Sequence, residues 1–251
     1  VGAPGGDVRI RIRGANSVLG DNSPLFVIDG FVGADFNSIN PNDIKSMEVL
    51  KDASSTAIYG SRGANGVVLI TTKNGSSAGD VHVTYDGSVS VSSMIKKYDL
   101  LTAAEYAQAY NEHNLAFGTA AIYSNEEIAA LEKNGGYDYL DAILRNAVSH
   151  QHQISIDGGN DRTQYRVSAN YLNQPGIVKE SGYNRLNARA SINSKINDRL
   201  KLRFNINASK SDGRNNGGYS SASTVINQAI AWNPTMGPYE ADGVTLRMND
   251  T

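Results

Sequence analysis

The sequence predicts a small α+β domain followed by antiparallel strands of a transmembrane β-barrel. Three observations support this fold class. Residues 1–75 mix short apolar segments with glycine-rich turns, residues 81–251 contain long segments in which apolar and polar residues alternate, and the connections between those segments are alternately short and long. Period-two alternation is the pattern of a strand with two different faces, and membrane barrels join such strands by short turns at one end and long loops at the other.

The composition excludes several classes of protein. A hydrophobic content of 40% over 251 residues is enough to build a core, and a net charge of −2 gives no strong field for gathering nucleic acid. Because the chain has no cysteine, it has neither disulfides nor thiolate metal sites. No apolar run approaches the roughly 20 residues of a spanning helix, so an integral membrane protein with this sequence must be a closed barrel.

The first 75 residues predict short elements of both kinds. The segment 24–28 is apolar and runs into the turn formed by Asp29 and Gly30, and the segment 66–70 has the composition of a buried strand. Tyr59 precedes Gly60, a residue typical of helix C-termini. The predicted elements are strands at 8–13, 24–28 and 66–70, with helical signals at 41–45 and 52–59.

From residue 81 onward the alternation becomes longer. Apolar residues occupy odd positions from 81 to 91, which predicts one strand, and four further alternating segments follow at 149–157, 163–172, 184–196 and 200–209. Short turns are predicted at 158–161 and 197–198, and longer links at 95–148, 173–183 and from 210. The first long link should contain two helices, because Thr102 with Glu105 and Ser124 with Glu127 form capping boxes.

About five strands cannot close a barrel, and an open sheet in lipid leaves an edge of unpaired backbone groups. We therefore expect further strands beyond Thr251, and we expect both ends of the chain to be cuts in a longer protein. The alternative is a soluble β-domain that turns its polar face to water.

Several ordered motifs resemble one family of outer-membrane transporters. Residues 8–14, 24–30, 39–44 and 47–67 are similar to the signature blocks of the lumen plug of the SusC/RagA family. Residues 98–107 and 154–159, followed by 176–178 and 183–185, resemble that family's first outer loop and early strands. The resemblance covers nearly the whole chain and is weakest over the last forty residues.

This resemblance implies a domain organisation. Residues 1–75 would be the plug domain of a TonB-dependent receptor, with its start missing, residues 76–80 a linker, and residues 81–251 the first part of a barrel of about 22 strands with a helical outer loop at 95–148. The family implies an outer-membrane location, a SusD-like surface lipoprotein as partner, TonB as energy source, and oligosaccharides or peptides as cargo. This sequence shows no TonB box, so coupling to TonB is what the resemblance implies.

The resemblance also implies where plug and barrel hold each other. Plug cations pair with barrel acids in related transporters, and the matching positions are Arg13 and Lys51, whose alternative role is that of ordinary solvated charges. From the strand pattern, Arg189 and Arg203 are suited to polar contacts between wall and plug. The residues that carry the plug signature and this possible plug–barrel latch are Arg13, Gly14, Asp29, Gly30, Glu48, Lys51, Asp52, Tyr59, Gly60, Arg62, Gly63 and Gly66.

Other motifs give weaker evidence about function. The pattern G-x-S-x-G at 75–79 follows a strand, but the helix of a nucleophile elbow does not come next, so we interpret it as a flexible linker. His150 and His152 could hold a metal only with a third ligand, and the face they share with apolar residues favours an outer interfacial position. Tyr219 and Tyr239 are free to meet a ligand in the terminal loop. We expect no enzyme activity, cofactor, metal or nucleic-acid partner.

Two functions remain open from the sequence. The first is TonB-dependent import of oligosaccharides or peptides, in which the plug gates the barrel lumen and a SusD-like lipoprotein assists. The alternative is a SusC-like outer-membrane scaffold that docks surface or assembly factors and transports nothing.

Overall fold

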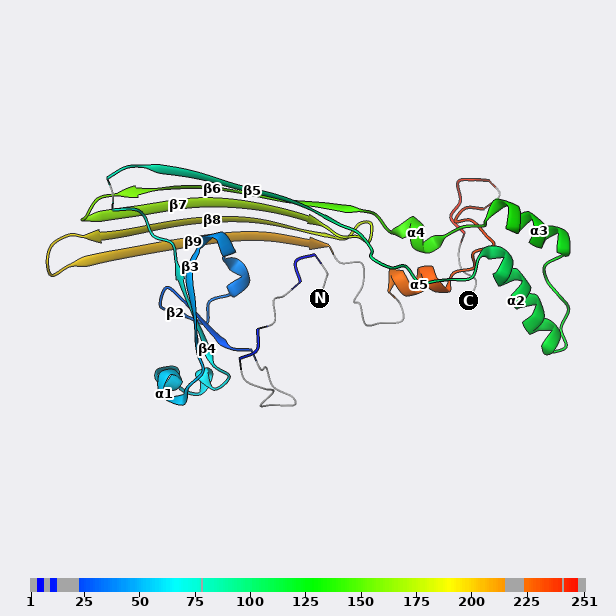
Figure 1. Ribbon diagram of the computed structural model, residues 1–251, viewed down its shortest axis with the longest axis horizontal. Coiled ribbons are helices and arrows are strands. Elements are labelled where there is room, and N and C mark those ends of the chain that lie inside the picture. Colours follow the sequence, from blue (N-terminus) through cyan, green and yellow to red (C-terminus); the bar gives the residue numbers. More distant parts are fainter. Residues whose placement is uncertain are drawn as a thin grey trace. The chain divides into compact units, whose positions relative to one another are not determined.

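The computed structural model describes residues 4–6, 10–12, 23–77, 79–214, 224–240 and 242–247. The chain divides into two compact units. The first comprises residues 1–91, 148–175 and 182–214 and holds two β-sheets, whereas the second comprises residues 92–147, 176–181 and 215–251 and holds most of the helices (Figure 1).

The small sheet of the first unit has four strands in the order β2-β1-β4-β3. The predicted strands at 24–28 and 66–70 are confirmed, and β1 pairs in parallel with β4. Asp29 and Gly30 form the two-residue turn between β1 and β2, with φ angles of 49° and 91°. Positive φ at both positions is the geometry of a type I′ hairpin turn. The strands are β1 (Leu25–Ile28), β2 (Phe31–Val32), β3 (Ile44–Leu50) and β4 (Val67–Thr72).

The helical prediction for 41–45 is wrong beyond its first turn. Only Pro41–Asp43 is helical, as the 3-10 helix η2, because the backbone of Ile44 already pairs with Thr72 in β3. The prediction for 52–59 is confirmed, but Gly60 does not end the helical region: it forms a kink with φ 58° and ψ −147°. The remaining elements are η1 (Phe36–Ser38), α1 (Ala53–Thr56) and η3 (Ala57–Gly63).

The predicted strand at 8–13 is not a strand where the structure describes it, at residues 10–12. Ile12 instead lies against the core of the small sheet, so close that a Cβ on Gly66 would come within 2.9 Å of its Cδ1 atom. An alternating apolar pattern indicates that one face of a segment is buried. A segment can bury that face against a core without hydrogen-bonding to a neighbouring strand, so the pattern alone does not prove a strand. Residues 7–9 and Arg13 lie outside the described residues.

The core of the small sheet consists of apolar side chains from β1, β4 and the η1 region. Ile28, Ile39, Val68 and Ile70 are buried together. The Phe26 and Phe36 rings stack beside them with centroids 5.1 Å apart. This core fixes the positions of the strand ends discussed below.

The large sheet has five antiparallel strands in sequence order, β5 to β9 (Figure 1). All five predicted strands and both tight turns are confirmed. The link predicted at 173–183 is shorter than expected, since only residues 176–181 separate β7 from β8. The strands are β5 (His82–Ser92), β6 (Ala147–Gly159), β7 (Thr163–Pro175), β8 (Gly182–Lys195) and β9 (Lys201–Arg214).

The two faces of the large sheet are inverted relative to a soluble protein. One face carries exposed apolar side chains such as Ile154, Val167 and Leu186. Polar side chains on the opposite face are buried, including Gln153, Ser155, Arg166, Ser168, Asn170, Asn187, Arg189 and Ser191. A contiguous apolar surface of this kind marks an interaction with lipid or another protein. The soluble alternative, in which the polar face meets water, does not describe this sheet.

The segment predicted as a flexible linker is held against the large sheet. A Cβ on Gly75 would lie 2.2 Å from the carbonyl oxygen of Tyr165, and the Gly79 N–H donates to the Gly159 carbonyl over 2.9 Å. Strand β5 follows, not a helix, so this segment has no nucleophile elbow. Ala78 lies outside the described residues.

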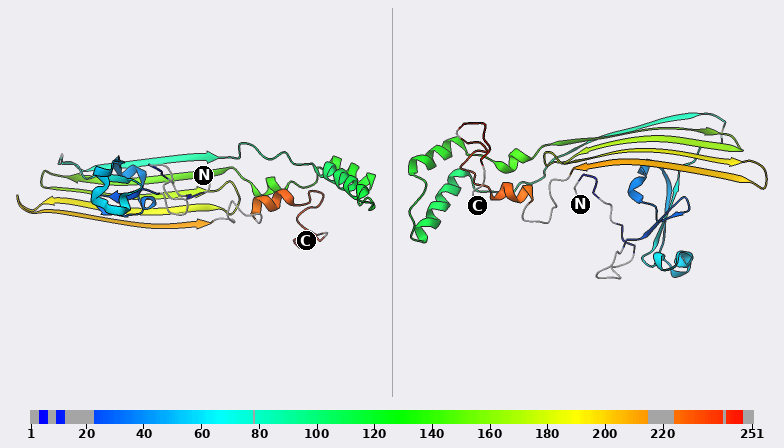
Figure 2. Two further views of the ribbon diagram at one scale, coloured as in Figure 1. Left: turned by 90° about the horizontal axis from the view of Figure 1, so that it is seen from below. Right: turned by 180° about the vertical axis from the view of Figure 1, so that it is seen from behind.

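The second unit contains four helices among its described residues, and α2 packs against α3 (Figure 2). Both predicted capping boxes are present, at Thr102 with Glu105 and at Ser124 with Glu127. Helices α4 and α5 were not foreseen. The helices are α2 (Ala103–Ala116), α3 (Asn125–Asn134), α4 (Tyr139–Ile143) and α5 (Val225–Ala231).

None of the helices that the structure describes is both long enough and apolar enough to traverse a membrane.

Replacing Ile70 by Ala should destabilise the small sheet by about 2–5 kcal/mol, because the side chain is buried and its loss leaves a cavity. Amide hydrogen exchange of β1 and β4 in the full-length protein measures this loss. Ile58→Ala is the matched control, since Ile58 is 81% exposed. Equal loss of protection in the two variants would contradict the assigned core.

The cap of α2 should weaken in acid. The Thr102 N–H and hydroxyl hydrogen-bond to Glu105 and lower the pKa of this carboxyl group. A carboxyl whose pKa is lower in the folded state stabilises the helix above its unfolded pKa, and this contribution disappears as the pH falls through the folded pKa. Exchange protection of the Glu105 and Tyr106 amides should therefore drop on acidification. Glu105→Gln, which cannot titrate, should remove that pH dependence.

Candidate functional site at the contact between the two sheets

Three strand ends meet at one edge of the small sheet. Because β1 and β4 are parallel, Asp29 after β1 and Thr72 at the end of β4 lie at the same edge. Strand β3 is antiparallel to β4, so Asp43, which precedes β3, lies there too. The topology thus collects two carboxylates and a hydroxyl from distant parts of the sequence. This edge faces the polar side of the large sheet.

Asp29 anchors the first group of contacts. Its Oδ1 atom accepts the Thr72 N–H over 2.9 Å, and its Oδ2 atom accepts the Thr72 hydroxyl over 2.6 Å. Arg189 of β8 reaches both residues through one nitrogen: Nη2 lies 2.5 Å from Asp29 Oδ2 and 2.5 Å from Thr72 Oγ1. The Thr72 hydroxyl therefore donates to the carboxylate and accepts from the guanidinium, which closes a three-membered network.

Asp43 anchors the second group. Its Oδ1 atom accepts from Gln153 Nε2 at 2.9 Å and lies 3.5 Å from Arg166 Nη2, while its Oδ2 atom accepts the Ser168 hydroxyl at 2.9 Å. Arg166 also donates to Asp157, its partner across β6 and β7, over 2.9 Å. One carboxylate of the small sheet is therefore bound by three side chains of the large sheet.

Neutral groups extend the contact on either side. Asn40 donates to Gln153 over 2.7 Å, and Arg185 donates to the Asn37 carbonyl over 2.8 Å. Asn187 donates to the Ser38 carbonyl over 3.1 Å. We call this whole set the inter-sheet contact: Asn37, Ser38, Asn40, Asp29, Asp43 and Thr72 of the small-sheet side, with Gln153, Asp157, Arg166, Ser168, Arg185, Asn187 and Arg189 of the large sheet.

The charges of the inter-sheet contact are almost fully removed from water. The side chains of Asp43, Arg166, Asp29 and Arg189 are between 7% and 11% exposed. Buried charges are costly unless paired and hydrogen-bonded, and removing one partner leaves the other uncompensated. The Nε atoms of Arg166 and Arg189 are buried without a protein partner in the described residues. The inter-sheet contact is thus strongly polar, and these two buried N–H donors in it have no hydrogen-bond partner among the described residues.

The inter-sheet contact has the opposite arrangement of charges to the latch that the resemblance implies, and Arg13 of that latch lies outside the described residues. Asp29 and Asp43 supply the negative charge from the small sheet, whereas arginines supply the positive charge from the large sheet. Lys51 is exposed and has no ion pair with any described carboxylate, so its place in a latch stays a prediction. Arg189 makes the wall contact expected of it, but Arg203 donates to Asn193 of the neighbouring strand instead.

The remaining predicted site residues do not join the inter-sheet contact. The Arg62 guanidinium covers Gly33, where a Cβ would lie 2.5 Å from Nη2. Tyr239 bridges to Leu246 in the second unit. Arg13, Gly14 and Tyr219 lie outside the described residues. The Asp52 carbonyl accepts the Thr56 hydroxyl at the start of α1. Among the described bonds, none joins Glu48, Tyr59, Gly60, Gly63 or Gly66 to the large sheet.

The two histidines share one face of β6, as the sequence predicts. Their ring centroids are 5.2 Å apart, and the Tyr85 hydroxyl lies 2.6 Å from His152 Nδ1. Tyr171 packs against His150 with centroids 5.9 Å apart. Over the residues that the structure describes, no three potential metal ligands come together.

Sequence reasoning missed Asp43, Thr72, Arg166 and Gln153. A signal for Arg166 and Gln153 was present, because both lie on the polar side of alternating segments. No comparable signal existed for Asp43 and Thr72. Their role depends on strand order in the small sheet, which the sequence pattern leaves open.

Comparison with known proteins identifies the family. The family described as "TonB-dependent Receptor Plug Domain" matches residues 1–67. TonB-dependent receptor P26 of Formosa agariphila is 42% identical over 247 residues, or 96% of this chain. TonB-dependent receptor SusC of Bacteroides thetaiotaomicron is 41% identical over 248 residues, or 95% of the chain. The chain belongs to the SusC/RagA family of TonB-dependent receptors.

The chain spans about a quarter of the length of these curated relatives, 24% and 23% respectively. Among solved structures, that of the RagAB peptide transporter superposes with a TM-score of 0.79 at 25% identity, covering 97% of this chain and 31% of the other. Its open-open state gives a TM-score of 0.78 at 26% identity, covering 97% of this chain and 30% of the other. Both sheets of this SusC/RagA chain therefore belong to the family's fold.

The match to the plug family separates the two sides of the inter-sheet contact. Asp29 and Asp43 lie within residues 1–67, while Arg166 and Arg189 lie beyond them. The matched residues include β1, β2 and β3 and end where β4 begins, so the small sheet of this SusC/RagA receptor chain is plug-like, and the large sheet, an open one here, follows it. The inter-sheet contact joins plug to wall.

Arg189→Ala should loosen the plug edge, because Asp29 would remain buried without its cation, at a cost of about 3–5 kcal/mol. The Thr72 amide, which donates to Asp29, reports this directly by hydrogen exchange in the full-length receptor. Arg203→Ala is the matched control, since this arginine bonds only within the large sheet among the described residues. The interpretation fails if Thr72 loses equal protection in both variants.

Proposed function

We propose that this chain is part of an outer-membrane importer in which TonB drives movement of the plug and thereby opens the barrel lumen to a nutrient. The chain spans about a quarter of its curated relatives, so the activity belongs to the whole receptor. The cargo class is oligosaccharides or peptides, and a SusD-like surface lipoprotein is the partner. One relative of known structure is a peptide transporter by its own description.

The observation that carries this proposal is the chemistry of the inter-sheet contact. A gating plug must close the lumen at rest and leave the wall under a pull. An apolar interface would resist separation by roughly 25 cal/mol for each Å² exposed to water. Hydrogen bonds and ion pairs are different, because water replaces them once separation starts, and one such bond contributes a net of only about 0.5–1.5 kcal/mol, or about 1.5–3 kcal/mol where a charged group takes part. Polar contacts therefore hold the plug against the wall at rest and still allow a pull to release it.

The inverted large sheet supports the membrane location. Its exposed apolar face suits lipid, while its buried polar face meets the plug. The five strands described leave open sheet edges, which lipid does not tolerate. In this proposal the remainder of the receptor closes the barrel.

A cross-link across the inter-sheet contact tests whether the plug must move. Ser168 Oγ lies 2.9 Å from Asp43 Oδ2, and the sequence contains no cysteine, so Asp43→Cys with Ser168→Cys gives one defined pair in this chain. Uptake by the full-length receptor should stop when the pair is oxidised and recover with a membrane-permeant reductant. Each single cysteine variant is the control for the loss of the native bond.

Undiminished uptake by the oxidised receptor would contradict a moving plug. Deleting TonB from the cell tests the energy source separately: uptake should be abolished. If cargo uptake is unchanged without TonB, or if the receptor moves no cargo while still recruiting surface proteins, the scaffold function replaces the importer.

A further inference from the structure

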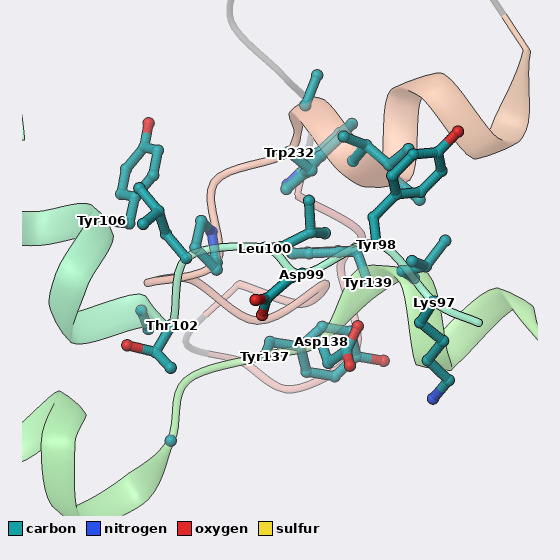
Figure 3. Close-up of a pocket in the computed structure, with 18 residues that line it drawn as sticks. Lys97, Tyr98, Asp99, Leu100, Thr102, Tyr106, Tyr137, Asp138, Tyr139 and Trp232 are labelled. Atoms are coloured by element: carbon teal, nitrogen blue, oxygen red, sulfur yellow. The ribbon is translucent and has the colours of Figure 1, made fainter.

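The second unit contains a pocket that the inter-sheet contact and the proposed gating do not use. Three segments form it: residues 97–106 before and within α2, residues 135–140 at the start of α4, and residues 229–234 at the end of α5 (Figure 3). Its volume is about 480 Å³. Small-molecule sites commonly measure roughly 300–1,000 Å³, so the pocket is large enough for a bound molecule.

Aromatic rings form much of the pocket wall. Tyr137 and Tyr139 meet with centroids 4.7 Å apart and planes inclined by 60°, and Tyr139 meets Trp232 at 5.6 Å. Local bonds fix this group, since the Tyr139 hydroxyl donates to the Met236 carbonyl over 2.9 Å and the Tyr137 N–H donates to the Pro234 carbonyl over 2.9 Å. Ring planes held in place in this way offer a binding surface at low entropic cost.

The polar groups of the pocket are mainly acceptors. The Asp99 carboxylate points toward the middle of the pocket, and Asp138 lies beside Tyr137 (Figure 3). One Asp138 oxygen already accepts the Asp141 N–H over 2.8 Å. Lys97, the one cation of the lining, forms an ion pair with Asp141. The pocket therefore favours a ligand that donates hydrogen bonds, and its net negative charge disfavours an anion.

A neutral sugar satisfies these requirements together. Its hydroxyl groups donate to carboxylates, and the C–H face of its ring packs on aromatic and aliphatic side chains such as Trp232 and Leu100. An isolated ammonium group would also be attracted to rings and acids. It would, however, leave most of the 480 Å³ unfilled. Volume and apolar lining thus favour the sugar over the cation.

We propose that this pocket is a binding site for neutral sugar units of an oligosaccharide, with Trp232 and Tyr139 as the stacking surface and Asp99 as the principal acceptor. This inference rests on the proposed import function and narrows its cargo from oligosaccharides or peptides to neutral oligosaccharides. The second unit, whose helices begin at side-chain caps, would then select the cargo.

Binding to the purified full-length receptor tests the site directly. The probes are maltotriose, cellotriose and mannotriose, with trilysine as the cationic probe and a galacturonic acid trimer as the anionic one, all measured by calorimetry. At least one neutral trisaccharide should bind, and Trp232→Ala and Asp99→Asn should each weaken it about tenfold or more, the loss that about 1.4 kcal/mol produces. Trp232→Phe, which keeps an aromatic face, should retain most of the affinity.

Phe117→Ala is the matched control, because this exposed ring belongs to the same unit but does not line the pocket. It should bind as the unaltered receptor does. The proposal is overturned if no neutral trisaccharide binds, if Trp232→Ala changes nothing, if trilysine binds here instead, or if another segment of the full-length receptor fills the pocket in its structure.

Uptake separates this inference from the proposed function. If uptake depends on TonB but neither pocket variant alters trisaccharide binding, the importer stands and the sugar site is wrong. If trisaccharide binding is lost in Trp232→Ala but uptake is unchanged without TonB, the site stands and the importer is wrong.

Discussion

The structure of the first unit depends on one constraint: the carboxylates of Asp29 and Asp43 are buried and must be compensated. Among the described contacts, Thr72 is the one small-sheet residue that donates to either carboxylate, and it donates to Asp29. Arginines and amides of the large sheet complete the network, with Arg189 on Asp29 and Arg166 on Asp43. The two sheets are therefore coupled through charge, and the edge of the plug cannot be described without the wall it meets.

The same constraint explains the inverted faces of the large sheet. Side chains that serve the plug must be polar, so the polar positions of β6, β7 and β8 point to the covered face and the apolar positions are left on the exposed one. Water does not suit that exposed face, whereas lipid does. Under the proposed import function, one alternating pattern provides both the membrane surface and the polar lining against which a plug can be held and released.

The second unit has a different physical basis. Its helices begin at side-chain caps that lie three residues from the groups they satisfy, so α2 and α3 are specified by nearby sequence. The pocket depends on more distant pairs, since residues near 98, 138 and 232 must come together to place the rings. Local capping thus supplies rigid supports, and tertiary packing arranges on them the aromatic and acidic groups that we propose bind sugar.

By itself, the sequence determined the five strands of the large sheet, the turn at Asp29 and Gly30, and both capping boxes, because period-two burial and short-range hydrogen bonds are encoded by neighbouring residues. It also showed that Arg189 suits a polar wall contact. Only the tertiary structure decided which charges meet. The pairing of Asp43 with Arg166 spans more than a hundred residues and requires the order β2-β1-β4-β3, which alternation cannot specify. A charge pattern gives the sign of each residue, whereas strand order and register give its partner.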